Sequence, residues 1–317
     1  MSGTEAIGID IGGTKIAVIR IDEHGEILAS KTVPTPARDA EATLHAAIGA
    51  AKEVLSPDVV AIGVGAAGII DYLAGTLRYA PNLAWRELAL RERIGGALGL
   101  PCVLDNDANA AAWAEFRFGA GRGSVDMLLV TVGTGIGGGI IAGGKTFRGA
   151  HGFAGEIGHV IVEPGGPMCG CGNAGCWEQV AAGRAIDRLA REAVGEHPNS
   201  LLAQLADGVP ANANGHTVTE AAEKGDDVAK AILATVGTRL GQGIAGLVNI
   251  LDSDLVVIGG GAMVAGDFLL DPARVAFTDA IEAPEHRPAV EIVAAQFGPE
   301  AGGVGAAALA LDDRPPV

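Results

Sequence analysis

The middle of the chain holds a cluster of metal-binding residue types. Cys169, Cys171 and Cys176 fall within eight positions, His159 lies ten residues before the first of them, and Glu178 follows the last by two. Three thiolates and one imidazole are a typical donor set of closed tetrahedral zinc sites. The alternatives are a disulfide, which a reducing cytosol disfavours, and an iron–sulfur cluster, which normally takes four cysteines. The cluster therefore favours a structural Zn²⁺ site beside one carboxylate.

Two glycine-rich turns have the composition of phosphate-binding loops. DIGGTK puts Asp10 at the end of a predicted strand, two glycines in the turn and Lys15 just after them. The N–H groups of such a turn can bind phosphate while the acid binds Mg²⁺. GTGIGGG (133–139) lacks the GK[ST] of a P-loop and opens no helix, so a plain hairpin is the alternative for both turns. Their pairing favours phosphate binding, and GGG (259–261) follows a strand where α/β proteins bind nucleotides.

A third group of polar residues joins a predicted strand to a predicted helix in DNDANAAAWAEF (105–116). Because Asp and Asn are preferred helix caps, one interpretation is that Asn106 or Asp107 only caps the helix. The other is that Asp107, at the helix N-terminus, accepts the proton of a substrate hydroxyl. The ordinary Asp pKa of about 3.9 is no obstacle, since phosphoryl transfer through a loose transition state depends mainly on orientation.

The order of the predicted elements indicates an α/β protein. Residues 6–33 alternate like three strands around two turns, and 127–144, which reads as strand, glycine loop and strand, weakly repeats the first hairpin. Further strands are predicted at 59–68, 101–105, 255–261 and 291–297. Helices are predicted at 39–55, 85–99, 107–119, 182–194, 217–223, 226–249 and 302–311. This order predicts two α/β lobes with a cleft between them.

Charge and hydropathy exclude several classes of protein. The formal net charge is -16, from 38 acidic residues against 22 Lys and Arg, so the surface repels a phosphate backbone. No run reaches the roughly 18 to 20 unbroken apolar residues of a membrane helix, and MSGTEAIGID has an acid where a signal peptide has basic residues. We therefore expect a cytoplasmic protein that binds neither nucleic acid nor membranes.

DIGGTK, NDAN, GTGIGGG, EIGH, CGCGNAGCWE and GGG follow one another in the order seen in the ROK family of sugar kinases, which the chain resembles over its full length. The resemblance implies the actin-like ATPase (ribonuclease H-like) fold, with two α/β lobes that each hold a mixed five-stranded sheet flanked by helices. We expect a small lobe of residues 1–106 plus 300–317 and a large lobe of residues 107–299 that carries the zinc site.

The resemblance also implies an activity: phosphorylation of glucose at its 6-hydroxyl by Mg-ATP, giving glucose 6-phosphate and ADP, with Asp107 as the general base. Asp10 would bind Mg²⁺, and the zinc ligands would be His159, Cys169, Cys171 and Cys176. The sugar ligands would be Asn82, Asn106, Asp107, Glu156, His159 and Glu178. The nucleotide ligands would be Asp10, Gly12, Gly13, Thr14, Lys15, Gly133, Thr134, Gly135, Gly137, Gly259, Gly260 and Gly261.

Alternatives remain within and outside this activity. The acceptor could be another hexose or N-acetylhexosamine, such as N-acetylglucosamine, N-acetylmannosamine, mannose or fructose, and a catalytically silent sugar sensor is the candidate from another class. Family repressors carry a DNA-binding domain ahead of the kinase core, which we do not expect here because the phosphate motif begins at Asp10. The cysteine motif favours ATP over polyphosphate, and family analogy suggests a homodimer or homotetramer. One departure is GAAGIID (65–71), where many relatives have proline before the glycine.

Overall fold

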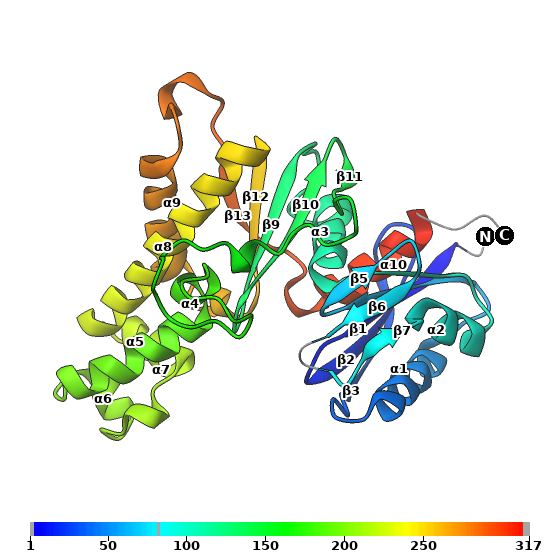
Figure 1. Cartoon of the computed structure of the whole chain (residues 1–317), viewed down its shortest axis with the longest axis horizontal. Helices are drawn as coiled ribbons and strands as arrows, with labels where there is room; N and C mark the ends of the chain where they lie inside the picture. The colour runs from blue at the N-terminus through cyan, green and yellow to red at the C-terminus, as the bar shows by residue number, and fades with distance from the viewer. Residues whose placement is uncertain (1–2, 81–82, 313–317) are drawn as a thin grey trace. The chain divides into compact units, whose positions relative to one another are not determined.

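Two mixed five-stranded sheets form the framework of the protein (Figure 1). Their strand orders are β3-β2-β1-β4-β8 and β11-β10-β9-β12-β13, and helices flank both. The computed structural model describes residues 3–80 and 83–312, so the predicted sugar ligand Asn82 lies outside the described residues. The predicted α/β class with two mixed five-stranded sheets is confirmed.

The first sheet joins an antiparallel meander to two parallel strands. The meander is β1 (Glu5–Ile11), β2 (Lys15–Ile21) and β3 (Ile27–Pro34). β4 (Val59–Ala66) runs parallel to β1, and β8 (Cys102–Asn106) runs parallel to β4. The carboxyl ends of β1, β4 and β8 therefore lie at one edge of the sheet, which is where polar ligands bind in open α/β sheets.

One face of this sheet is covered by α1 (Ala40–Val54). The helix begins where the carboxylate of Asp39 accepts the N–H of Ala42 at 3.0 Å, which satisfies one unpaired donor of its first turn. Its apolar residues recur at helical spacing and pack on the isoleucines of β1 in one buried cluster. The residues of α1 that carry this contact are Leu44, Ala47, Ala51 and Val54.

The other face carries α3 (Asp107–Phe118) and α10 (Ala301–Asp312). These helices approach the sheet and each other at backbone distance, because glycines stand at the crossing points. A Cβ atom on Gly8 would overlap the carbonyl of Gly303, one on Gly63 that of Ala306, and one on Gly305 that of Ala110. Each separation is below 3.0 Å, a distance that real Cβ contacts essentially never show. The predicted last helix, α10, thus packs against β1, β4 and α3.

The second sheet contains the glycine hairpin predicted at 127–144. It consists of β9 (Met127–Val132), β10 (Ile136–Ala142), β11 (Lys145–Thr146), β12 (Leu255–Gly259) and β13 (Glu291–Ala294). β10 pairs antiparallel with β11, whereas β12 pairs parallel with β13. The predicted strand at 291–297 ends at Ala294 because a new turn, η5 (Gly298–Glu300), soon leads into α10.

Helices make up most of the chain between β11 and β13. They are α4 (Glu178–Ala181), α5 (Gly183–Glu196), α6 (Leu201–Leu205), α7 (Gly215–Glu223), α8 (Asp227–Leu251) and α9 (Asp267–Ala280), with 3₁₀ turns η1 (Ile157–His159), η2 (Pro210–Asn212), η3 (Gly261–Ala265) and η4 (Pro284–His286). Length and composition would allow α8 to cross a membrane, but half of its most apolar window is buried inside the protein, where it packs on α9. It is therefore explained as a core helix.

A small third sheet was missed by the sequence prediction. It contains β5 (Ile69–Asp71), β6 (Thr76–Tyr79) and β7 (Arg86–Leu88), and the helix predicted at 85–99 is α2 (Leu90–Leu98). Strands of three or four residues leave too short an alternation to detect. α9 was missed as well, because Pro272 stands inside it and proline normally argues against a helix interior.

The chain forms two compact units. The first comprises the described residues of Met1–Leu129, Gly138–Gly155 and Ala295–Val317, and the second comprises Val130–Gly137 and Glu156–Ala294. α3 belongs to the first unit because it packs on α10. The predicted lobe boundary between residues 106 and 107 is not a boundary of these units, and as a division of the fold it stays a prediction.

Candidate active site

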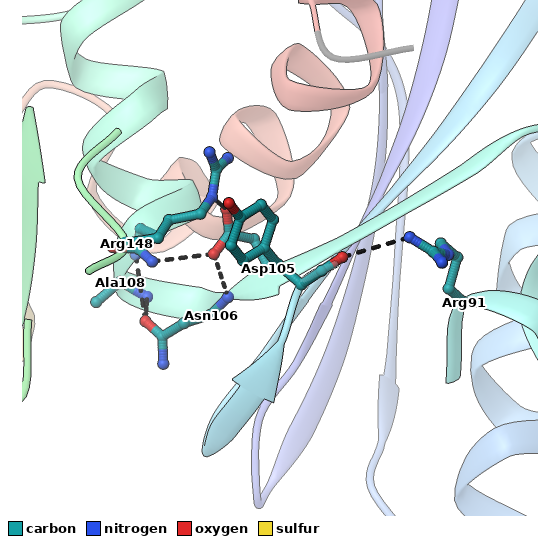
Figure 2. Close-up of polar contacts among 7 residues, drawn as sticks. Arg91, Asp105, Asn106, Ala108 and Arg148 are labelled. Carbon is teal, nitrogen blue, oxygen red and sulfur yellow. Dashed lines mark hydrogen bonds and ion pairs between the residues drawn. The ribbon is translucent and has the colours of Figure 1, made fainter. Parts of the chain in front are cut away.

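Asn106 ends β8, directly before α3 (Figure 2). Asp107 is the first residue of α3. The side-chain oxygen of Asn106 accepts the N–H groups of Ala108 at 2.8 Å and Asn109 at 3.2 Å, so Asn106 is the helix cap. Its amide also donates to the carbonyl of Gly68 at 3.3 Å. The capping interpretation therefore applies to Asn106, and Asp107 is not needed for that role.

The carboxylate of Asp107 lies in the first turn of α3 and accepts the N–H of Ala108 at 3.0 Å. Burial raises the pKa of Asp107 above its ordinary value, and the hydrogen bonds from Ala108 and Asn106 offset only part of this effect. A raised pKa brings a carboxylate closer to the range of an effective general base at neutral pH. The environment of Asp107 therefore differs from that of the ordinary, solvated Asp that the sequence suggested.

Asp10 is the second carboxylate at this edge of the first sheet. It is the last residue but one of β1, opposite Gly65 of β4, and a Cβ atom on Gly302 in α10 would lie 2.6 Å from its carboxylate oxygen. Burial and the negative charge of Asp107 raise the pKa of Asp10 to about 7, while Lys15 opposes the shift. Two carboxylates in one partly buried environment form a site that a divalent cation would stabilise.

The turn between β1 and β2 is held by its own backbone and by Thr35. The N–H of Gly12 donates to the carbonyl of Lys15 at 3.1 Å, and the Thr35 hydroxyl donates to the carbonyl of Gly12 at 2.8 Å. Thr14 and Lys15 are exposed, and Gly13 is partly exposed. The turn beside Asp10 can therefore offer donors to an anion.

The GTGIGGG segment is a hairpin between β9 and β10, as predicted. The start of α5 supports it, since the N–H groups of Gly183 and Arg184 donate to the carbonyls of Gly133 at 2.9 Å and Thr134 at 3.3 Å. Gly137 is the second residue of β10. The hairpin is thereby fixed on a helix N-terminus within the second unit.

The GGG turn lies against this hairpin. Gly259 ends β12 and Gly261 begins η3, while Gly260 between them has φ +94° and packs its Cα on the backbone of Val132, the last residue of β9. A side chain at Gly260 would be strained and would overlap Val132. The two glycine turns of the second unit are therefore neighbours at the ends of β9 and β12.

The four predicted zinc ligands converge. One donor atom from each of His159, Cys169, Cys171 and Cys176 lies within 4.8 Å of all the others. The Cys171 and Cys176 sulfurs are 3.6 Å apart, far beyond the 2.05 Å of a disulfide but near the separation expected for two thiolates at about 2.3 Å from one zinc ion. Nδ1 is the ring nitrogen of His159 that faces the cluster, 3.6 Å from the Cys169 sulfur.

Glu178 connects this cluster to the GTGIGGG hairpin. Its Oε1 accepts the Cys169 thiol at 3.1 Å and the amide of Gln179 at 3.0 Å. Its Oε2 occupies the place where a Cβ atom on Gly135 would be, so the carboxylate lies on the backbone of the hairpin. Glu178 is thus placed by both neighbours.

Glu156 precedes the short turn η1 in the same unit, and His159 is the last residue of that turn. Both are exposed, and the N–H of His159 donates to the carbonyl of Glu156 at 3.1 Å. Gly158 between them packs on the carbonyl of Ile136 in β10, which fixes the turn on the second sheet.

The predicted residues thus fall into two groups, one in each unit. The first unit holds Asp10, Gly12, Gly13, Thr14, Lys15, Asn106 and Asp107. The second holds Gly133, Thr134, Gly135, Gly137, Glu156, His159, Glu178, Gly259, Gly260 and Gly261 with the three cysteines. The sequence did not single out Arg148, which pairs with Asp105 at 2.7 Å, because nothing in the pattern links positions 43 residues apart.

The two mixed five-stranded sheets, flanked by helices, have the actin-like ATPase fold. The paired carboxylates and the glycine turns lie at the edges of these sheets. Residues 6–313 match the ROK family, and the chain belongs to it.

Individual relatives match along the whole chain. The chain is 42% identical over 312 residues to the glucokinase of Streptomyces coelicolor, covering 98% of each. It is 34% identical over 313 residues to the N-acetylmannosamine kinase of Escherichia coli, covering 97% of this chain and 99% of the relative. The solved ROK glucokinase of Streptomyces griseus, in complex with glucose and AMPPNP, has a TM-score of 0.87 and 44% identity, with 97% of this chain and 99% of that chain covered.

Proposed function

We propose that the protein is an ATP-dependent glucokinase that transfers the γ-phosphoryl group of ATP to the 6-hydroxyl of glucose. The observation that carries the proposal is the carboxylate of Asp107, held at the start of α3 beside Asp10 with its pKa raised. Full-length similarity to two Streptomyces glucokinases, one solved with glucose and AMPPNP, supports the choice of both substrates.

In this reaction Asp107 orients the sugar hydroxyl and accepts its proton as the oxygen attacks the γ-phosphorus and the bond to the ADP oxygen breaks. Proton acceptance and orientation are what a loose phosphoryl-transfer transition state requires from a protein side chain. Asn106, whose amide is fixed by Gly68 and the first turn of α3, hydrogen-bonds a neighbouring sugar hydroxyl. Glu156, His159 and Glu178 of the second unit, and Asn82, complete the proposed sugar contacts.

The nucleotide contacts are assigned to the glycine turns. The Gly12–Lys15 turn and the Gly133–Gly137 hairpin donate N–H groups to the phosphates, and Gly259–Gly261 contacts the adenosine. Asp10 fits Mg²⁺, because a carboxylate whose pKa burial raises to about 7 gains from a bound cation. A Mg²⁺ ion held by Asp10 would neutralise the charge that develops on the transferring phosphoryl group.

Zinc fits the cluster of His159, Cys169, Cys171 and Cys176. The donor set and the 3.6 Å sulfur separation suit one tetrahedral ion, whose contribution is structural. Because Glu178 follows the ligand Cys176 by two residues and lies on Gly135, a bound ion would restrict a sugar ligand and a phosphate loop together. A cytoplasmic location and a homodimeric or homotetrameric state are also proposed, by analogy with the family.

Coupled measurement of ADP release with Mg-ATP and a panel of sugars tests the proposal. Turnover should be highest with glucose, and absence of turnover with every hexose would refute the kinase assignment. N-acetylmannosamine is the second candidate acceptor, because the 34% identical relative carries that name. Replacing ATP with polyphosphate in the same panel tests the phosphoryl donor. Asp107→Asn should lose about 10³-fold in kcat or more while calorimetry still detects glucose binding.

A further inference from the structure

Asp105 is a buried carboxylate directly behind the proposed catalytic turn, and the proposed mechanism gives it no task. Its Oδ1 accepts the N–H of Asn106 at 2.8 Å and the side-chain amide of Asn109 at 2.9 Å. Its Oδ2 accepts Nε of Arg148 at 2.7 Å (Figure 2). The Asp105 and Arg148 side chains are 5% and 17% exposed, so this ion pair is largely removed from water.

These bonds fix both ends of the segment that presents Asp107. Asn106 precedes Asp107 and Asn109 follows it by two residues, and both are tied to the one carboxylate of Asp105. Asn109 is only 1% exposed, so water cannot replace the hydrogen bond that its amide makes to Asp105. The direction in which the side chain of Asp107 projects from α3 therefore depends on Asp105.

Arg148 in turn is held in a fixed orientation. Its guanidinium lies over the ring of Tyr72, 4.8 Å from the centroid, and the carbonyl of Tyr72 accepts Nη1 of Arg91 at 3.3 Å. Tyr72 belongs to the turn between β5 and β6, and the carbonyl of Arg148 closes its own loop by accepting the N–H of Ala154 at 3.2 Å. One guanidinium thus connects three segments of the first unit: the small sheet, the loop before Glu156 and the start of α3.

We propose that Asp105 and Arg148 are a positioning pair for the acceptor side of the reaction, which orients Asp107 and Asn106 without touching the sugar. This inference rests on the proposed function. The guanidinium donates Nε–H to Asp105 Oδ2 while its planar face stacks on the Tyr72 ring, an arrangement that the ammonium group of lysine reproduces poorly. Loss of the pair lets the α3 turn shift, and a misplacement of about 1 Å costs a phosphoryl-transfer site on the order of 100-fold.

The test compares Arg148→Lys, Arg148→Met and the double variant Asp105→Asn/Arg148→Met with wild type. We expect each to lower kcat by about 100-fold while KM for glucose changes by less than about tenfold. The control is Arg93→Met, which removes the exposed pair between Arg93 and Glu41 in the same unit and should leave kcat unchanged.

Stability separates positioning from a purely structural role. Arg148→Met strands a buried charge and should lower Tm, whereas the double variant removes both charges and should recover most of that loss. A positioning pair predicts that kcat stays low in the double variant although Tm returns. Recovery of kcat together with Tm would overturn the inference.

Hydrogen exchange keeps this test independent of the kinase assignment. The N–H groups of Ala108 and Asn109 should exchange faster in the double variant than in wild type, and their exchange rates should be unchanged in Arg93→Met. Unchanged exchange at these amides would overturn the positioning role. Faster exchange in a protein that phosphorylates no sugar would support the positioning of the turn while refuting the proposed function.

Discussion

The contact between α10 and α3 makes a sharp prediction for Gly305→Ala. A Cβ atom at Gly305 would overlap the carbonyl group of Ala110 and lie 3.1 Å from the backbone nitrogen of Ala114. These are backbone atoms inside a helix, so no side-chain rotation relieves the overlap. The two helices must move apart or distort.

The magnitude follows from two opposing effects. Alanine in a helix interior is favoured over glycine by about 1 kcal/mol, while overpacking a core typically costs about 1–3 kcal/mol. Backbone overlap belongs at the upper end of that range, so we expect a net loss of about 2 kcal/mol at Gly305. The matched control is Gly49→Ala inside α1, where a Cβ atom would meet nothing within 4 Å. There the gain of about 1 kcal/mol should appear alone.

Urea unfolding of both variants measures this difference, about 3 kcal/mol between two chemically identical substitutions in the same unit. The comparison requires equal m-values, because the midpoint reports stability only if the exposed surface is unchanged. If Gly305→Ala were as stable as Gly49→Ala, the close approach of α10 to α3 would be refuted.

Three other predictions follow from the site. Burial and Asp107 raise the pKa of Asp10 to about 7 from the ordinary 3.8, so the folded protein retains a proton that the unfolded chain releases. The contribution of Asp10 to stability should therefore fall as pH rises from about 4 to 7, by at most about 1.4 kcal/mol per pH unit. In magnesium-free buffer Asp10→Asn should reduce this slope, while the raised pKa of Asp107 keeps part of it; an equal pH dependence of the urea midpoints of wild type and variant would contradict the shift. Zinc removal or Cys171→Ser should weaken glucose binding in calorimetry and should also lower Tm. Normal glucose affinity would mean that the ion stabilises the fold without affecting the sugar site. Gly135→Ala should displace Glu178 and raise KM for glucose by about tenfold, with Gly246→Ala, which meets nothing within 4 Å, as the control.

Features formed by residues that lie close together in the sequence could be predicted from their types and spacing. The three cysteines and His159 stand close enough along the chain to predict a group of metal-binding residue types, and their donor atoms converge. Asn106 caps α3 as the rule for helix N-termini requires. The glycine hairpin at 133–139 is a strand–turn–strand unit because its glycines separate two apolar runs.

Long-range contacts were not predictable in the same way. Nothing near Asp105 indicates a partner 43 residues later, because ion pairs between distant segments leave no period in a sequence. Gly8, Gly63 and Gly305 read as small residues of strands and a helix, and only the packed structure reveals that each lies at a backbone crossing. The role of Asp107 could be suggested from its place at a helix start, but its raised pKa comes from burial.

The position of α10 also bears on how the protein is made. Ribosomal synthesis releases β1, β4 and α3 first, then the whole second unit, and only afterwards the helix that covers them. Until then the apolar face formed by Ala6, Ile19 and Ile21 lacks the part of its cover that α10 supplies, and Asp10 lacks its neighbour Gly302. The first unit therefore cannot mature in order of synthesis. The nascent chain carries a partly open sheet face while residues 119–300 are translated, a period in which chaperone binding or aggregation competes with folding.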